Sequence, residues 1–210
     1  MRRRASGMHD HYYSASPSSE HRYASCAFSY RGQTLQFTTD AGVFSRGEVD
    51  YGTETLLKSL PDPVEGRVLD MGCGWGAVGV CVGKKYPSCA IVMSDVNQRA
   101  LSLAQDNAKA NGVKAETAQS DGLDSVAGSF DYILTNPPIR AGKQVIYRLF
   151  SQSAEQLRPS GWLYLVIRKQ QGAESALKYL KTIFDTVETV EKSGGFWVIR
   201  CQGGKKNRDV

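Results

Sequence analysis

The segment Asn136-Pro137-Pro138 follows the apolar run 132–134 after a single threonine, and its residue types suit the chemistry of an amino group. Proline cannot donate a hydrogen bond to a sheet and restricts the backbone, so the polar end of this run is rigid. The side-chain oxygen of Asn136 and the carbonyl oxygen of Pro137 can each accept a hydrogen from a planar amine. Two such acceptors position the amine and draw its nitrogen toward tetrahedral geometry, which favours direct displacement without a metal or a strong base.

A second pattern joins an aspartate to three glycines at alternate positions, at the end of another apolar run. These residues are Asp70, Gly72, Gly74 and Gly76. Glycines let the backbone turn tightly and let a ligand lie against the main chain. With Ala77 the first two glycines also match the dinucleotide fingerprint, and Asp95 lies where either type of cofactor presents a ribose diol. A nicotinamide dinucleotide, S-adenosylmethionine and a tight turn without ligand therefore all remain open at this point.

Two carboxylates favour S-adenosylmethionine. Asp70 comes just before the glycines, and a carboxylate there suits a cationic amino group better than an anionic pyrophosphate. S-adenosylmethionine carries such an ammonium group and has no phosphate. Asp121, after a later strand, is placed to accept from an adenine amino group, although an ordinary turn aspartate is the simpler interpretation of that residue alone.

Strands that alternate with helices must position these residues. The pattern predicts strands at 66–72, 89–95, 114–121, 130–136, 161–169, 186–192 and 196–202, and helices at 53–60, 77–86, 97–112, 144–157 and 173–184. Such alternation predicts an α/β fold with a Rossmann-like, doubly wound, mostly parallel seven-stranded sheet. The turn Ser193-Gly194-Gly195 joins the last two strands as a hairpin, which gives one antiparallel edge strand.

The rest of the chain divides into short segments around one domain. Residues 1–20 are polar and predict a flexible arm, in which Met8 is a candidate natural start. Residues 21–40 predict a small β-hairpin that turns at Arg31-Gly32. We expect a cofactor-binding core over 50–203 within a single domain, 21–203, followed by a basic tail, 204–210.

Composition limits the compartment and the partners. No apolar run approaches the roughly 20 residues of a membrane span, and no hydrophobic segment follows the basic N-terminus as a secretory signal requires. Five cysteines with no zinc-type spacing predict a reduced, cytoplasmic chain without a metal. The net charge of +5 is compatible with an RNA partner. Basic residues follow the two prolines or end a later strand: Arg140, Lys143, Arg148, Arg168 and Lys169.

Together these motifs resemble a class I S-adenosylmethionine-dependent methyltransferase that acts on amino nitrogens. The upstream run GVFSRGEVDYGTETLL is similar to the "methyltransferase small" domain of bacterial ribosomal RNA guanine-N2 methyltransferases, which modify 16S rRNA. The resemblance covers about residues 12–201. It includes the run NPPIRAGK and is closest to short, single-domain members from Gram-positive bacteria.

The resemblance implies roles for the matching residues. Asn136, Pro137, Pro138 and Phe44 would form the catalytic centre. Residues that would hold the cofactor are Asp70, Gly72, Gly74, Gly76, Asp95, Val96, Asp121, Gly122, Asn136, Asp50, Gly52 and Thr53. Residues that would contact the substrate are Phe44, Ser45, Ile139, Arg140, Lys143, Arg168 and Lys169.

Two departures from the family pattern matter. Many amino-methyltransferases follow the prolines with an aromatic residue that stacks on the target base, whereas this chain has Ile139, so Phe44 is the alternative stacking residue. The N-terminal half of two-domain members is also missing. RNA must then be bound by the hairpin, the arm and the basic residues.

The sequence thus predicts methylation of an exocyclic amine, with N2 of a guanine in 16S rRNA as the leading target and ribosomal RNA or the small ribosomal subunit as partner. The base would be flipped or single-stranded. The same chemistry leaves open a glutamine amide of a release factor or ribosomal protein, and adenine N6 in nucleic acid. An NAD-dependent oxidoreductase is the alternative from another class, but the sequence offers no candidate residues for hydride transfer. The hypothesis of a non-catalytic RNA-binding module does not explain why Asp70, the glycine turn, Asp95 and Asn136 are all present.

Overall fold

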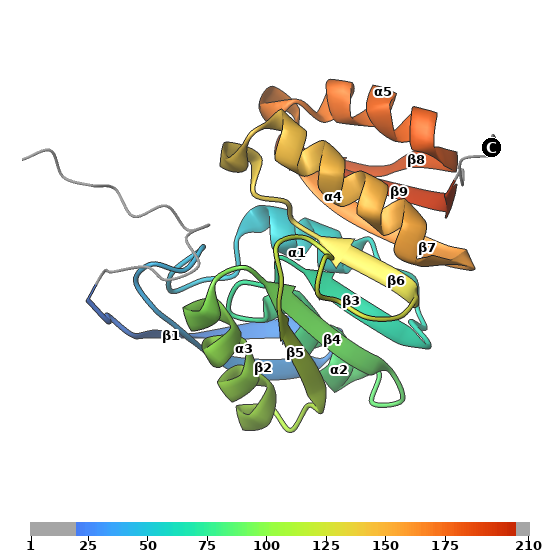
Figure 1. Ribbon diagram of the computed structural model, residues 1–210. Coiled ribbons are helices and arrows are strands. Elements are labelled where there is room, and N and C mark those ends of the chain that lie inside the picture. Colours follow the sequence, from blue (N-terminus) through green and yellow to red (C-terminus); the bar gives the residue numbers. More distant parts are fainter. Residues whose placement is uncertain (1–19, 205–210) are drawn as a thin grey trace, which may run out of the picture.

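The computed structural model describes residues 20–204, which form a seven-stranded sheet with helices on both faces and a separate two-stranded hairpin (Figure 1). The strand order is β5-β4-β3-β6-β7-β9-β8. The predicted arm lies outside the described residues except for Glu20, and the predicted basic tail does so except for Gly204. The division into arm, domain and tail stays a prediction.

The strands of the large sheet lie close to their predicted positions. They are β3 (Arg67–Met71), β4 (Ala90–Asp95), β5 (Ala115–Gln119), β6 (Phe130–Thr135), β7 (Leu157–Arg168), β8 (Phe184–Ser193) and β9 (Phe196–Gly204). The first five pair in parallel, and β9 runs antiparallel to both β7 and β8. The mostly parallel sheet with antiparallel pairing at one edge is therefore confirmed; the antiparallel strand lies just inside the edge strand β8.

Helices cover both faces of the sheet because the strand side chains alternate between two apolar clusters. Val68 and Leu134 point into a cluster with α1 (Tyr51–Lys58), α2 (Ala77–Lys85) and α3 (Gln98–Ala110). Leu69 and Ile133 point the other way, into a cluster with α4 (Lys143–Gln156) and α5 (Ala173–Ile183). A sheet buried on both faces and wound in this way carries its functional loops at the carboxyl ends of its strands.

The predicted N-terminal hairpin is confirmed as β1 (Ala24–Tyr30) and β2 (Gln33–Thr39). Its turn residues Arg31 and Gly32 both have positive φ angles, 43° and 79°, which matches the twist of a two-residue hairpin. Asn107 of α3 and Asn111, the C-cap of this helix, hold the outer edge of β2. The Asn107 amide bonds the N–H and C=O of Thr38, and the Asn111 amide bonds those of Gln36, at 2.8–3.1 Å. The hairpin is therefore fixed to α3.

One element boundary bears directly on the site. The sequence pattern starts the first helix at residue 53, but α1 begins at Tyr51. Asp50 caps this helix, because its Oδ1 accepts the backbone N–H groups of Gly52 and Thr53. The cap places the Asp50 carboxylate beside the carboxyl end of β6.

The strand order reverses direction between β3 and its neighbour β6, so the loops after β3, β4 and β5 face the loops after β6 and β7. Ligands of open α/β sheets bind at such a switch point. No helix within residues 20–204 is both long and apolar enough to cross a bilayer.

Candidate active site

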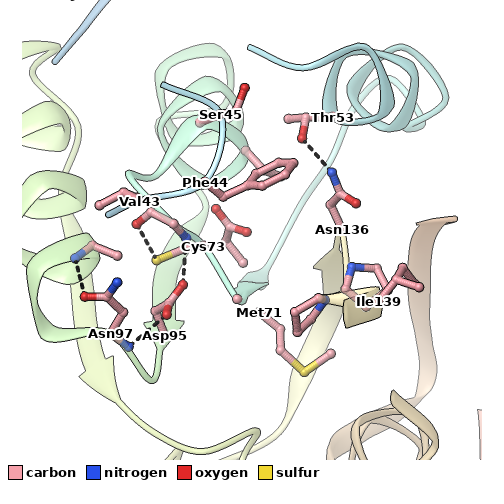
Figure 2. A pocket seen from close by; sticks show the side chains of 18 of the residues that line it. Val43, Phe44, Ser45, Thr53, Met71, Cys73, Asp95, Asn97, Asn136 and Ile139 are labelled. Atoms are coloured by element: carbon pink, nitrogen blue, oxygen red, sulfur yellow. Dashed lines mark hydrogen bonds between the residues drawn. The ribbon is translucent and has the colours of Figure 1, made fainter. Parts of the chain in front are cut away.

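A cavity of about 880 Å³ opens at the carboxyl ends of β3 to β7 and is partly covered by residues 43–51 (Figure 2). This volume lies near the upper end of the roughly 300–1,000 Å³ that is typical of small-molecule sites. The lining follows the strand order. Residues after β5 and β4 form one end, residues after β3 the middle, and residues after β6 and β7 the other end.

The glycine turn after β3 has two functions. Gly72 and Gly74 have φ angles of 70° and 55°, and a Cβ atom at either position would meet nothing within 4 Å. Their main chain is therefore bare toward the cavity, as the sequence predicts. Gly76 differs, because a Cβ atom there would lie 3.0 Å from Cβ of Ala104. Its role is to let α2 pack closely on α3.

Asp70, at the end of β3, is buried and lines the cavity. Its Oδ2 accepts the N–H of Gly79, in the first turn of α2, at 2.8 Å. Burial raises the pKa of Asp70 to about 7; the bond from Gly79 opposes this shift, and the nearby Asp95 carboxylate adds to it. Among the described residues no Lys, Arg or His pairs with Asp70. An arriving cation would therefore favour the ionised carboxylate.

Asp95, at the end of β4, is held against the glycine turn. Its Oδ2 accepts the N–H of Gly74 at 2.8 Å, and its Oδ1 accepts the N–H of Asn97 at 2.9 Å. Burial raises the pKa of Asp95, while these backbone bonds lower it. Asn97 is in turn the N-cap of α3, so the carboxylate has one fixed orientation. Val96 lines the cavity beside it.

Asp121 and Gly122 lie at the far end of the cavity, after β5. The Asp121 carboxylate forms an ion pair with Arg148 of α4, which also approaches Asp124 at 3.9 Å. All three side chains are well exposed. Arg148 is thus neutralised by two carboxylates at this end.

The amide of Asn136 has a single consistent orientation. Its Nδ2 lies 3.1 Å from Oγ1 of Thr53 (Figure 2) and 3.3 Å from Oδ1 of Asp50. The Thr53 hydroxyl donates to Oδ2 of Asp50 at 2.5 Å. An ionised carboxylate only accepts hydrogen bonds, so the amide nitrogen must face Asp50. The amide oxygen receives no hydrogen bond from the described residues and can accept one from a substrate.

Phe44 and Ser45 belong to a loop that the glycine turn anchors. The Trp75 indole donates to the carbonyl oxygens of Phe44 and Ser45 at 2.9 and 3.2 Å. The Phe44 ring is half exposed, and Figure 2 shows it between Cys73 and Asn136. The Ser45 hydroxyl donates to the carbonyl of Glu48 at 2.7 Å, within its own loop.

Beyond Asn136 the cavity ends at Tyr51, Phe196 and Arg168. The Phe196 ring lies between the start of α1 and the Arg168 guanidinium, whose Cζ is 5.0 Å from the ring centroid. Ile139 lines the same end, but it is partly buried against the cluster of α4 and α5. It therefore offers less surface to a planar ring than its place after the prolines suggests.

The structure brings most of the predicted residues to one cavity. Four of them do not line it: Gly52, Gly76, Lys143 and Lys169. Lining residues that sequence patterns missed include Tyr51, Trp75 and Phe196, and Arg148, which the sequence marks only as one of several basic residues, lines the cavity as well. Tyr51 and Phe196 stand directly after the motif residue Asp50 and after the Gly194-Gly195 turn, which is the only local signal for either.

Basic side chains surround the β6 and β7 end of the cavity. Arg140, Lys143, Arg168 and Lys169 are exposed, and no described carboxylate lies within 4.0 Å of any of them. Their charges are available to a phosphate. Within residues 20–204 there is no group of three or more His, Cys, Asp or Glu side chains placed to hold a metal ion.

Comparison with known proteins agrees with this geometry. A family model described as the methyltransferase small domain matches residues 34–200. The uncharacterized protein YbxB of Bacillus subtilis is 44% identical over 199 residues, covering 93% of this chain and 99% of that protein. Ribosomal RNA small subunit methyltransferase C of Pseudoalteromonas atlantica is 35% identical over 191 residues, covering 88% of this chain and 52% of that protein. This chain therefore spans about half the length of that methyltransferase.

A solved structure shares the fold over most of the chain. The T. thermophilus 16S rRNA N2 G1207 methyltransferase (RsmC), in complex with AdoMet and guanosine, superposes with a TM-score of 0.78 and 26% sequence identity. The match covers 86% of this chain and 50% of that chain.

Proposed function

Because this chain belongs to the methyltransferase small domain family, its methyl donor is S-adenosylmethionine, and we propose that it methylates N2 of a guanine in 16S ribosomal RNA. The family membership agrees with the resemblance drawn from the motifs. It also removes the support for an NAD-dependent oxidoreductase. The guanine target is favoured by the relatives, which include small-subunit rRNA methyltransferases and a structure with bound guanosine.

The residues present fit the cofactor. The buried Asp70 carboxylate, which has no cationic partner among the described residues, would hold the amino group. The bare main chain of Gly72 and Gly74 would lie against the methionine portion. Asp95 would accept from the ribose, and Asp121 and Gly122 would border the adenine. When bound, S-adenosylmethionine supplies an electrophilic methyl group on a positively charged sulfur.

The observation that carries the proposed reaction is the orientation of Asn136. The amide nitrogen donates to Asp50 and Thr53, so the amide oxygen is left to accept from the target amine. The rigid Pro137 supplies a second acceptor. We therefore assign Asp50 and Thr53 to the positioning of Asn136, in addition to their place in the cavity wall. The Phe44 ring would cover the flat target base.

An RNA substrate also accounts for the basic side chains around the β6 and β7 end of the cavity. Arg140, Lys143, Arg168 and Lys169 would contact phosphates, since no described carboxylate neutralises them. The proposed partner is ribosomal RNA or the small ribosomal subunit, and the proposed compartment is the cytoplasm. Methylation of a protein glutamine amide or of adenine N6 would use the same Asn136 geometry.

Mapping of modified nucleosides tests the proposal. Digested 16S rRNA from cells with and without the gene is compared by mass spectrometry, with complementation by wild type and by Asn136→Ala. We expect one N2-methylguanosine to disappear with the gene and to return only with wild type. An unchanged rRNA profile beside an undermethylated protein glutamine would instead assign the activity to a protein substrate.

A further inference from the structure

The cavity continues past Asn136 to three side chains that no sequence motif singles out together: Tyr51, Phe196 and Arg168, here called the aromatic patch. We propose that the aromatic patch binds the nucleotide next to the target guanine in a single-stranded RNA segment, with its base on Tyr51 and its phosphate on Arg168. This inference rests on the proposed function. It adds a second nucleotide subsite to the same cavity.

The strand order places the aromatic patch on the correct side. The glycine turn follows β3, Asn136 follows β6, and Arg168 ends β7 while Phe196 begins the adjacent β9. Neighbouring strands are about 4.8 Å apart, so the patch lies about one nucleotide beyond Asn136, on the side away from the cofactor. A strand that delivers its base to Asn136 must continue in this direction or leave the cavity.

The aromatic patch is built by close packing of separate elements. A Cβ atom on Gly52 would lie 2.8 Å from the Phe196 ring, and a Cβ atom on Gly194 would overlap the Tyr51 ring. The Tyr51 and Ser193 hydroxyls share a hydrogen bond at 2.8 Å, and the N–H of Lys169 donates to the carbonyl of Gly195 at 2.8 Å. The two glycines therefore admit the two rings, and the surface is ordered before any ligand arrives.

The chemistry of the aromatic patch suits a nucleotide. The Tyr51 ring is 49% exposed at the mouth of the cavity, whereas the exposed side chains Tyr23 and Val190 do not line it. Arg168 is held over Phe196 and keeps an unpaired charge within the described part of the chain. An aromatic face beside an unpaired arginine is the combination that binds single-stranded RNA through stacking and phosphate contact.

The partly buried Ile139 explains why a separate surface is needed. Ile139 packs against the cluster of α4 and α5, and Phe44 lies on the cofactor side of Asn136. Phe44 can therefore cover the target base, while only the aromatic patch presents a ring to its neighbour. This division separates the roles of Phe44 and Tyr51, the two exposed aromatic residues among those that line the cavity.

The test uses the full-length protein and a single-stranded RNA oligonucleotide with one guanine. Two further oligonucleotides carry an abasic nucleotide on the 5′ or the 3′ side of that guanine. Transfer of labelled methyl groups gives kcat/KM for wild type, Tyr51→Leu and the conservative Tyr51→Phe. For wild type and Tyr51→Phe, kcat/KM should be roughly 5- to 150-fold lower on one of the abasic oligonucleotides than on the intact one, because the base that stacks on the ring is missing. For Tyr51→Leu, kcat/KM should be the same on that oligonucleotide and on the intact one.

Arg168 gives an independent readout. The affinity for the intact oligonucleotide is measured by fluorescence anisotropy at several salt concentrations. The slope of the logarithm of the binding constant against the logarithm of the salt concentration should be smaller in magnitude by about one for Arg168→Ala than for wild type. Lys114→Ala is an equal charge change just before β5, at the end of this strand opposite the cavity, and should keep the wild-type slope.

Each result decides between the possibilities. The subsite would be overturned if kcat/KM on the abasic oligonucleotide fell equally for wild type and Tyr51→Leu, or did not fall for wild type. An unchanged salt dependence of binding for Arg168→Ala would also overturn it. If wild type methylates no RNA while the nucleoside map shows a protein target, the proposed function fails instead. Anisotropy would still measure the aromatic patch in that case, and equal RNA affinity for wild type and Tyr51→Leu would remove it too.

Discussion

The half of the cavity over β3 and β4 differs from the half over β6, β7 and β9 in how its polar groups are satisfied. In the first half, Asp70 and Asp95 are largely buried and accept backbone N–H groups at fixed distances. In the second half, Tyr51, Arg140 and Arg168 are exposed, and no described carboxylate pairs with either arginine. Asn136 lies at the boundary, with one end of its amide held and the other free.

The difference matches the ligands that we propose for the two halves, S-adenosylmethionine and RNA. The cofactor is the same small molecule in every turnover, so a rigid, desolvated site holds it at little cost in ordering. An RNA segment is large and charged, and exposed cations with aromatic rings bind it through its phosphates and base faces. Substitutions in the two halves should therefore fail in different ways.

The largest effect is expected at the boundary. Asn136→Ala removes the oxygen that we propose as an acceptor for the reacting amine, and loss of one such preorganised group typically costs about 10²–10³ in rate. Methyl transfer to rRNA should fall by that factor, while the dissociation constant of S-adenosylmethionine, measured by calorimetry, stays within a few-fold of wild type. Transfer at the wild-type rate would remove Asn136 from the reaction.

In the cofactor half, Asp70→Asn should weaken S-adenosylmethionine binding by roughly 10- to 100-fold, because a charge-assisted bond worth about 1.5–3 kcal/mol is lost. The pKa of Asp70 is raised to about 7, so wild-type affinity should increase as pH rises through 7 and the carboxylate ionises. The increase in affinity should end at about pH 7.7, where the α-amino group of S-adenosylmethionine loses its own proton. The variant should show no such increase in calorimetry.

Stability provides the control for Asp70→Asn. A carboxyl whose pKa rises from 3.8 to about 7 on folding binds its proton more tightly in the folded state, so stability falls as pH rises between these values. The amide carries no such penalty. The variant without cofactor should therefore melt at or above the wild-type temperature at pH 8, although it binds the cofactor more weakly.

A smaller effect is expected at Thr53, which holds the amide of Asn136. Thr53→Val removes the hydroxyl that accepts from Asn136 and donates to Asp50. The bond to Asn136 is worth about 0.5–1.5 kcal/mol, so the transfer rate should fall by roughly two- to tenfold. Thr53→Ser should restore the rate because it keeps the hydroxyl. A drop in kcat with unchanged cofactor affinity would confirm positioning, whereas a loss of cofactor affinity alone would assign Thr53 to the cofactor half.

The smallest effect is expected at the exposed end of the cofactor half. Arg148→Ala breaks an exposed ion pair with Asp121, and such pairs contribute about 0–1 kcal/mol. Cofactor affinity should change by no more than about fivefold, measured by calorimetry at low and high salt. A larger loss would show that Arg148 itself contacts the cofactor and would extend the rigid half to this residue.

Much of the fold and part of the site could be predicted because they depend on local chemistry. Alternation of apolar runs gave seven strands and five helices near their observed places. Gly72 and Gly74 were identified because their backbone conformations favour glycine. The helix cap at Asp50 was missed, so α1 begins two residues before its predicted start, because an aspartate two residues before a glycine is equally compatible with a loop.

The sequence by itself determined the motif chemistry, namely the carboxylate before a bare glycine turn and the rigid amide corner after a strand, since both are properties of a few consecutive residues. Only the tertiary structure decided which way that amide faces, because its partners Asp50 and Thr53 lie 86 and 83 residues away along the chain. It likewise decided that Arg148 pairs with Asp121 and that Tyr51 lies beside Phe196. Such contacts depend on strand order and on loops folding over the sheet, which no local pattern specifies.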